Sequence, residues 1–266
     1  MPSQTSQTTK TCNCGKEFDT WTAGDECRDC MTKRVEAERL VKMQAELPEQ
    51  QKLQREAWIE QCGPGLQVRF IGKTFANFNK SLQPKAWEAM SKWESVEESG
   101  SILLLSPDLY GVGKTHLASA LVNHLLESTE SVRLTKNGLF RARTCPVYFT
   151  GEVALLSRIR STFNRRGEDS ESEEDFYTLM AGMELLIIDD VGKVRPRDPA
   201  FLQSVYYRII DERYGFELPI ILLSNLSLAE LENHIGGACA DRLREMCGKN
   251  IFTMKGRSQR LPPITR

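Results

Sequence analysis

Residues 108–115, Asp-Leu-Tyr-Gly-Val-Gly-Lys-Thr, have the types and spacing needed to bind phosphate groups. A phosphate-binding loop follows the pattern G-x-x-x-x-G-K-[ST], and here only the first glycine is replaced, by Asp108. In such a loop backbone N–H groups surround the phosphates, Lys114 reaches the terminal ones, and the Thr115 hydroxyl binds Mg²⁺. We therefore expect the nucleotide to contact Gly111, Val112, Gly113, Lys114, Thr115 and His116.

The flanking residues predict the elements that position this loop. Residues 101–106 are a short apolar run, which indicates a buried parallel strand. After the loop, apolar spacing predicts an amphipathic helix through Leu117, Ala120, Leu121, His124 and Leu125. An ordinary glycine turn entering a helix is the alternative, and the strand–loop–helix order favours the phosphate loop.

A second candidate for nucleotide chemistry is the segment 185–190, Leu-Leu-Ile-Ile-Asp-Asp. Four apolar residues predict a buried strand, and the carboxylates then emerge near the Mg²⁺ of the phosphate loop, as in a Walker B strand. We assign Asp189 to the metal and Asp190 to the base or water-orienting carboxylate. The alternative is a core strand capped by surface aspartates, and the preceding phosphate loop argues against it.

Two further polar residues are candidates for sensing the terminal phosphate. Asn225 follows the apolar run 220–223, where its side chain would reach the γ-phosphate or the attacking water. It would equally well turn the chain before Leu226. Arg242 is a candidate arginine finger supplied to a neighbouring subunit, and its alternative is a salt bridge on a helix surface.

Four of the eight cysteines have the spacing of a structural metal site. Cys12-x-Cys14 and Cys27-x-x-Cys30 would supply four thiolates to a closed tetrahedral zinc site, although the first pair is one residue short of the usual C-x-x-C. Free reduced thiols are the alternative. A short polar segment has little core of its own, so bound zinc would supply its folding free energy.

Composition and hydropathy bound the fold and the compartment. The chain has 266 residues, a net charge of −1 and no apolar run near the ~18 residues that a membrane helix needs. Without a secretion signal we expect a cytoplasmic protein with no membrane contact. We predict two regions: residues 1–63, with the cysteines and a helical segment that Pro48 breaks, and residues 64–266.

The region 64–266 alternates apolar strands with helical patterns. Strands are predicted at 146–150, 184–189 and 220–224, with helices at 153–163 and around Leu202, Val205, Tyr206 and Ile209. This alternation predicts an α/β fold with a doubly wound parallel sheet and a site at the carboxyl ends of its strands. The charged run 165–175 is predicted to be a solvated surface loop.

These motifs occur in an order that resembles one family. The chain resembles the AAA+ ATPases of the DnaC/DnaI helicase-loader and IstB-like family. The similar segments are the lead-in 69–78 and, in order, residues 112–118, 189–192, 223–225, 241–243 and 256–260. The resemblance implies an AAA+ P-loop sheet flanked by helices, ATP/ADP and Mg²⁺ as ligands, and self-assembly with a shared site. By this resemblance, Lys114 and Thr115 would bind nucleotide and metal, and Asp189 would bind the metal. Asn225 would be the first sensor and Arg242 the arginine finger.

Two departures from the family pattern bear on turnover. Asp108 replaces the first glycine of the loop, and Asp190 is shorter than the glutamate common in this superfamily. Both suggest slow hydrolysis, as in an ATP-gated switch.

The resemblance also implies contact with single-stranded DNA. Basic residues with an aromatic among them track a nucleic-acid backbone, and the candidates are Arg158, Arg160, Phe163, Arg165 and Arg166. A solvated helix face balanced by the acidic run is the alternative. The cysteine module and the helix after it resemble the part of such loaders that docks onto the hexameric replicative helicase.

We therefore expect an ATP-dependent loader of the replicative helicase onto single-stranded DNA, in a bacterium or a phage. An IstB-like regulator that acts with a transposase on duplex DNA shares the ATPase core and is the first alternative. A non-hydrolysing adaptor, in which nucleotide orders a binding surface, is the second.

Overall fold

The computed structural model describes residues 9–19, 26–96, 98–128, 131–135, 138–142, 144–162, 172–195 and 198–260. The chain forms two compact units, which are described separately. The smaller unit comprises Met1–Gln54 with Glu130–Ala142, and the larger comprises Arg55–Thr129 with Arg143–Arg266. The boundary therefore falls inside the first helix, whereas the sequence placed it at the glycine-rich segment after residue 62.

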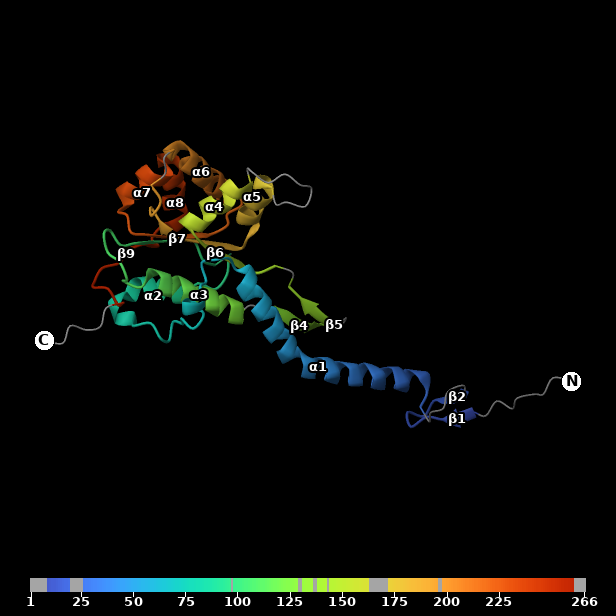
Figure 1. The fold of residues 1–266 in the computed structure, drawn as a ribbon. Coiled ribbons are helices and arrows are strands. Elements are labelled where there is room, and N and C mark those ends of the chain that lie inside the picture. The colour runs from blue at the N-terminus through green and yellow to red at the C-terminus, as the bar shows by residue number, and fades with distance from the viewer. Residues whose placement is uncertain are drawn as a thin grey trace. The chain divides into compact units, whose positions relative to one another are not determined.

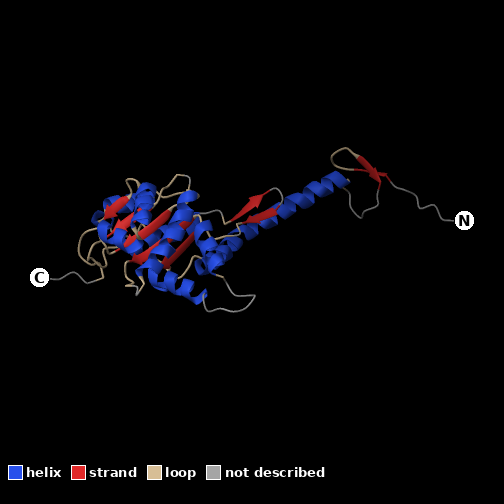
Figure 2. Ribbon diagram, turned by 90° about the horizontal axis from the view of Figure 1, so that it is seen from above, coloured by secondary structure: helices blue, strands red, loops and turns tan. Residues whose placement is uncertain are grey.

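The larger unit is built on a five-stranded parallel sheet, as predicted (Figure 2). The strand order is β6-β7-β8-β3-β9. The strands are β3 (Ile102–Leu105), β6 (Val147–Gly151), β7 (Leu185–Val191), β8 (Ile220–Ser224) and β9 (Ile251–Thr253). All four predicted strand segments begin and end within two residues of the observed strands β3, β6, β7 and β8, while β9 is too short to stand out in the sequence.

Helices cover both faces of this sheet (Figure 1). The helices α2 (Pro84–Ser91) and α3 (Lys114–Ser128) lie on one face. The other face carries α4 (Glu152–Thr162), α5 (Glu173–Gly182), α6 (Pro199–Gly215), α7 (Leu228–Ile235) and α8 (Gly237–Cys247). Because both faces are covered, β3 and β8 are apolar and buried throughout, which confirms the doubly wound architecture.

The edge strand β6 is covered by the segment that follows the first helix. Phe149 donates its backbone N–H to the Cys62 carbonyl at 2.6 Å, and Gly65 donates to the Phe149 carbonyl at 2.8 Å. A Cβ on Gly65 would lie 2.6 Å from the Phe149 ring, so the close approach requires glycine. The predicted linker thus protects a sheet edge from pairing with another chain.

The smaller unit contains two antiparallel strand pairs and most of a long helix. The pairs are β1 (Thr9–Thr11) with β2 (Glu17–Asp19), and β4 (Val132–Thr135) with β5 (Gly138–Arg141); the helix is α1 (Arg28–Gln61). The predicted break at Pro48 is wrong, since α1 continues through it. Pro48 and Gln44 are both exposed, so water can bond the carbonyl that the proline leaves without a donor.

The β4–β5 hairpin was not predicted from the sequence. It is inserted between α3 and β6 and packs on α1 within the smaller unit. Gln51 donates to the Val132 carbonyl at 3.0 Å, and Arg141 donates to the Gln50 side chain. A Cβ on Gly138 would lie 3.6 Å from Met43, which places the hairpin turn over α1.

The charged run 165–175 is not a loop throughout. Residues 163–171 lie outside the described residues, and α5 begins at Glu173. Ser172 caps this helix in a capping box with Asp175. The acidic residues that suggested a solvated loop stabilise the positive N-terminus of a helix instead. Among the described helices, none has the length and apolarity required to span a bilayer.

Candidate functional site

A cleft of about 1100 Å³ opens at the carboxyl ends of the parallel strands. The phosphate loop enters it after β3, the two aspartates of β7 line it, and Asn225 enters it after β8. The cleft therefore brings together the predicted residues Lys114, Thr115, Asp189, Asp190 and Asn225. Carboxyl ends of parallel strands meet at one sheet edge, which is why residues far apart in sequence converge here.

Lys114 is buried and directed into this cleft. Its Nζ donates to Asn225 Oδ1 at 2.6 Å and to Ser106 Oγ at the end of β3. Burial lowers the pKa of Lys114, while the carboxylates of Asp189 and Asp190 favour its charged form. The lysine is thus held by two neutral oxygens, which an anionic phosphate would replace as stronger partners.

Thr115 and Asp189 place two oxygens side by side. The Thr115 hydroxyl donates to Asp189 Oδ2 at 2.7 Å, and Asp189 Oδ1 accepts the backbone N–H of Asp190 at 2.7 Å. Burial raises the pKa of Asp189, because desolvation disfavours the charged carboxylate, and the neighbouring charge of Asp190 acts in the same direction. A hydroxyl and a carboxylate oxygen in contact fit Mg²⁺, which prefers oxygen ligands and would compensate the buried negative charge.

Asp190 occupies a bulge in β7. Ile188 pairs with Leu222 and Val191 with Ser224, so β7 has one more residue than β8 in this interval. Asp190 lies at this bulge with φ 56°, a left-handed conformation that aspartate tolerates. The bulge turns the Asp190 side chain into the cleft, where Lys193 pairs with its Oδ2 at 2.9 Å.

The backbone of the phosphate loop explains Asp108. Asp108 has φ 55°, Gly111 φ 74° and Gly113 φ 107°. The first position of the motif therefore needs the left-handed region, which glycine usually supplies and aspartate also adopts. The Asp108 N–H donates to the Asn225 carbonyl at 3.1 Å, so this turn is fixed to the segment after β8. The substitution preserves the loop conformation.

His116 connects the phosphate loop to the lead-in segment. Its Nε2 lies 2.8 Å from Asn77 Oδ1 and 3.2 Å from the Thr74 carbonyl, and its ring packs edge-on against Phe78. A Cβ on Gly113 would lie 2.7 Å from the Phe78 ring. Burial lowers the pKa of His116, so the imidazole is neutral near pH 7. His116 lines the cleft and holds the segment that covers the loop.

The C-terminal segment lies against the phosphate loop, and sequence reasoning gave it no role. Gln259 donates its N–H to the Gly111 carbonyl at 2.9 Å and its side-chain amide to the Val112 carbonyl at 3.3 Å. Arg260 lines the cleft, and its positive charge contributes to the lowered pKa of Lys114. The signal in the sequence is the closing Arg-Ser-Gln-Arg, which marked the resemblance but has no local pattern that indicates a site.

Arg242 does not line the nucleotide cleft of its own chain. Its Nη2 pairs with Asp211 Oδ1 at 2.9 Å, and its guanidinium lies over Tyr207 at 5.2 Å and Tyr214 at 5.8 Å. These partners all belong to α6. This position is compatible with both interpretations of the sequence, an arginine finger for a neighbouring subunit and a salt bridge on a helix surface.

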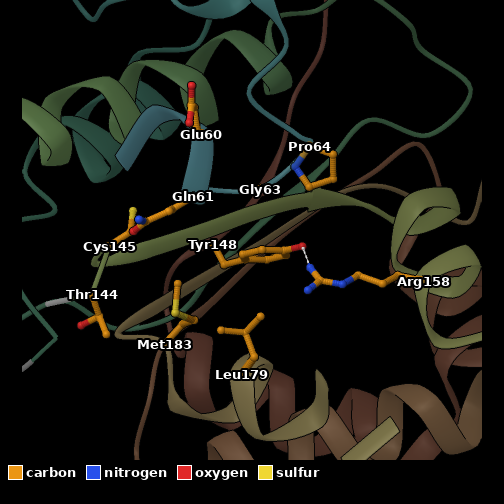
Figure 3. A pocket seen from close by; sticks show the side chains of 10 residues that line it. All are labelled: Glu60, Gln61, Gly63, Pro64, Thr144, Cys145, Tyr148, Arg158, Leu179 and Met183. Carbon is orange, nitrogen blue, oxygen red and sulfur yellow. Dashed lines mark hydrogen bonds between the residues drawn. The ribbon is translucent and has the colours of Figure 1, made fainter. Parts of the chain in front are cut away.

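The basic residues of α4 face different directions. Arg158 donates to Tyr148 Oη at 2.7 Å beside a cavity of about 630 Å³, as Figure 3 shows, and lies 4.6 Å from the centre of the Phe176 ring. Arg160 lies over Phe201 of α6. Residues two apart on a helix do not share a face, so these arginines do not form one strip. Phe163, Arg165 and Arg166 lie outside the described residues.

The four predicted metal ligands cluster in the smaller unit. The Sγ atoms of Cys12, Cys14, Cys27 and Cys30 all lie within 4.8 Å of one another. Tetrahedral Zn–S bonds of about 2.3 Å place sulfurs about 3.8 Å apart, so the donors fit zinc with little movement. Backbone hydrogen bonds from Cys14 and Cys27 lower the pKa of Cys12 to about 6, whereas hydrogen bonds with the neighbouring thiols raise the pKa of Cys30 to about 12. Several thiolates this close repel one another unless a cation lies between them, which a metal ion would supply.

Comparison with known proteins agrees with this geometry. The sequence model of the family described as IstB-like ATP binding protein matches residues 66–263. The replicative helicase loader DnaC of Buchnera aphidicola subsp. Baizongia pistaciae is 30% identical over 135 residues, 50% of this chain and 47% of that protein. DnaC of Escherichia coli K12 is 26% identical over 134 residues, 50% and 46% of the two chains. The chain thus spans about half the length of these curated relatives.

Solved structures show the same fold. The crystal structure of the DnaC helicase loader superposes with a TM-score of 0.54 at 20% identity, covering 71% of this chain and 100% of that one. AMPPCP-bound DnaA from Aquifex aeolicus gives 0.52 at 18% identity, covering 73% and 53%. With the family match over most of the chain and the predicted nucleotide residues gathered in one cleft, the chain belongs to the IstB-like, DnaC-related family of AAA+ ATPases.

Proposed function

We propose that this protein is an ATP-dependent loader of a hexameric replicative helicase onto single-stranded DNA. The observation that carries the ATP-dependent part is the convergence of Lys114, Thr115, Asp189 and Asn225 in one cleft. The relatives named as helicase loaders support the choice of partner.

Each residue of the cleft takes a role that its contacts support. Lys114 would exchange Asn225 for the β- and γ-phosphates, and Thr115 and Asp189 would hold Mg²⁺, whose charge would offset that of the phosphates. Asn225, released from the lysine, orients the attacking water or senses the γ-phosphate. Asp190 accepts the proton of that water. Arg260 is placed to bind phosphate from the C-terminal segment.

Slow turnover follows from the contacts of Asp190 more than from Asp108. Lys193 pairs with one oxygen of Asp190, and this cation competes with the attacking water for the carboxylate. Asp108, by contrast, keeps the loop in the conformation that glycine would give it. We infer that ATP acts here as a slowly consumed switch, and that Lys193 contributes to the slow rate.

Self-assembly would complete the site through Arg242. The arginine already lies on the protein surface next to Tyr207 and Tyr214, which are partly exposed. To act as a finger it would leave Asp211 and reach the γ-phosphate bound by the neighbouring subunit. The ion pair with Asp211 is partly exposed, and an ion pair near the surface is exchanged at modest cost.

The cysteine cluster and α1 support helicase docking. Four thiolates leave no open coordination position, so bound zinc is structural and fixes the β1–β2 hairpin next to the start of α1. DNA contact by the basic residues of α4 remains part of the proposal, with Arg160 better placed than Arg158, whose guanidinium is engaged with Tyr148.

The competing function is that of a regulator acting with a transposase on duplex DNA, which the resemblance in sequence allows and with which the match to the IstB-like ATP binding protein family is compatible. Immobilised full-length protein should be incubated with the replicative helicase and with a transposase, each with ATP and with ADP. Capture of the helicase that depends on the nucleotide supports the loader. Capture of the transposase alone overturns it. Equal capture of the helicase with both nucleotides and with Lys114→Ala contradicts both the ATP-dependent loader and the adaptor whose binding surface nucleotide orders.

A further inference from the structure

Glu152 is a fully buried carboxylate at the start of α4 that none of the roles above uses. Its Oε2 accepts the backbone N–H groups of Gly192 at 3.1 Å and Val194 at 2.9 Å. Its Oε1 accepts the Tyr206 hydroxyl at 2.8 Å and lies 2.6 Å from His234 Nε2. A buried carboxylate with four donors is stable only because each of its lone-pair positions is occupied.

The four donors come from three different parts of the larger unit. Gly192 and Val194 belong to the turn that follows Asp190, Tyr206 belongs to α6, and His234 belongs to α7. Burial raises the pKa of Tyr206, so its hydroxyl keeps the proton that it donates. Glu152 therefore ties the turn after β7 to α6 and to α7, and α7 contributes Glu230 to the lining of the nucleotide cleft.

A second contact holds the same turn from the sensor side. Gly192 has φ 90°, and a Cβ there would lie 2.3 Å from Leu226 Cδ1. Leu226 directly follows Asn225, and its own N–H donates to Ser224 Oγ, which in turn donates to the Val191 carbonyl at 2.6 Å. The turn carrying Asp190 is thus packed against the residue next to Asn225, and Glu152 closes it on the opposite side.

We propose that Glu152 is a positioning residue of the nucleotide site, whose carboxylate holds the turn 191–194 so that Asp190 and Asn225 face the same phosphate. This inference rests on the proposed ATPase function. Glu152 makes no hydrogen bond to Lys114, Thr115 or the backbone of the phosphate loop among the described contacts. Its loss should therefore reduce the rate of hydrolysis while leaving nucleotide affinity nearly unchanged.

Two substitutions separate hydrogen bonding from space filling. Glu152→Gln keeps one oxygen that can accept both N–H groups of the turn, while its amide faces Tyr206 and His234, each of which can accept a hydrogen bond. Glu152→Leu fills similar volume and leaves Gly192 and Val194 without an acceptor. Met180→Ala is the matched control, since Met180 is fully buried and lies near Arg213 and the start of β7, far from the turn.

Nucleotide affinity, kcat and amide hydrogen exchange should be measured for wild type, the three variants and Lys114→Ala. We expect Glu152→Leu to lower kcat by about 10- to 100-fold with affinity within about threefold, because a small misplacement of a reacting group has effects of this size. Exchange of the 192–194 amides in the nucleotide-free protein should rise by about tenfold or more. Glu152→Gln should restore most of both properties.

The outcomes are distinguishable. If Glu152→Leu matches wild type in kcat and exchange, or if Met180→Ala lowers kcat equally, the positioning role is wrong. If wild type shows no hydrolysis that depends on Lys114, the proposed function fails. The exchange of the 192–194 amides then still decides whether Glu152 holds the turn, because that measurement needs no nucleotide.

Discussion

Lys114 donates a hydrogen bond to Asn225 Oδ1 at 2.6 Å across 111 residues of sequence. The contact follows from the sheet register, in which Leu105 of β3 pairs with Ser224 of β8. Residues that leave neighbouring parallel strands at the same level must meet at the carboxyl edge. The lysine and the asparagine for which we propose nucleotide-binding and sensing roles are thus hydrogen-bonded to each other, and we expect nucleotide binding to separate them.

Asn225→Ala is expected to lower kcat by about 100-fold, a size typical for loss of one polar group that acts in the transition state. ATP affinity should stay within a few-fold or improve, because Lys114 would lose a competing partner. Phosphate release and equilibrium binding of a fluorescent ATP analogue measure the two quantities. Asn233→Ala, an exposed substitution on α7, is the control and should behave as wild type.

Asp189→Asn is expected to stabilise the nucleotide-free protein while abolishing hydrolysis. Burial raises the folded-state pKa of Asp189, so ionising this carboxylate costs stability as the pH rises above the unfolded-state pKa of about 4. Removing the charge should raise Tm at pH 7, by about 2–4 °C for each kcal/mol gained. Thermal denaturation with and without ATP–Mg²⁺ tests this. A lower Tm for the apo variant at pH 7 would contradict the assignment of a strained buried carboxylate.

The nucleotide residues could be predicted because each belongs to a local pattern. The phosphate loop, the aspartates after an apolar strand and the asparagine after the next one are adjacent to strands that hydrophobicity marks clearly. Glu152 and Ser106 could not be found in this way. Glu152 is one acidic residue at the start of an amphipathic helix, and only the folded chain brings it to the turn after β7.

The fold was predicted in its core and missed at its margins. The strands β3, β7 and β8 are buried on both faces, so continuous apolar runs indicated them. The strand β9 and the hairpin 132–141 are short or exposed and depend on partners distant in sequence. The helix break predicted at Pro48 is wrong because the effect of proline on a helix is local, and an exposed helix can tolerate it.

Arg213→Met is expected to destabilise the larger unit by about 3–5 kcal/mol, since it leaves buried carbonyls without donors. The buried guanidinium donates to the carbonyls of Met180 at 2.7 Å, Met183 at 2.9 Å and Pro219 at 2.6 Å. Urea denaturation measures the loss. Arg208→Met, on the same helix, removes exposed ion pairs to Glu174 and Glu212 and should cost less than about 1 kcal/mol. Equal losses of unfolding free energy for both variants would contradict the view that Arg213 stabilises the larger unit by donating to buried carbonyls.

Zinc content tests the cysteine module. The purified chain should carry about one zinc per molecule by elemental analysis, and Cys27→Ser should lose most of it. Because protons compete with the metal for the thiolates, zinc should be retained at neutral pH and released on acidification. Cys239→Ser, a buried cysteine of α8, is the control and should keep its zinc. Retention of full zinc by Cys27→Ser would exclude the four-thiolate site.

Substitutions of Asp108 test its backbone role. Asp108→Gly should change stability by less than about 0.5 kcal/mol, because both residues tolerate the left-handed conformation at φ 55°. Asp108→Val should cost more than about 1 kcal/mol and weaken ATP binding, since a β-branched residue is strained there. Chemical denaturation and nucleotide binding provide the measurements. A large gain in kcat for Asp108→Gly would show that the aspartate itself slows turnover.

The central claim is that ATP binding at Lys114 drives delivery of a helicase to single-stranded DNA. The direct measurement is the loading of the replicative helicase onto circular single-stranded DNA coated with its binding protein, followed by unwinding of an annealed strand. We predict loading with wild-type protein and ATP, a loss of about tenfold or more with Lys114→Ala, and full loading with Asn233→Ala. Loading by Lys114→Ala equal to that of wild type, or no stimulation by wild-type protein, would contradict the account.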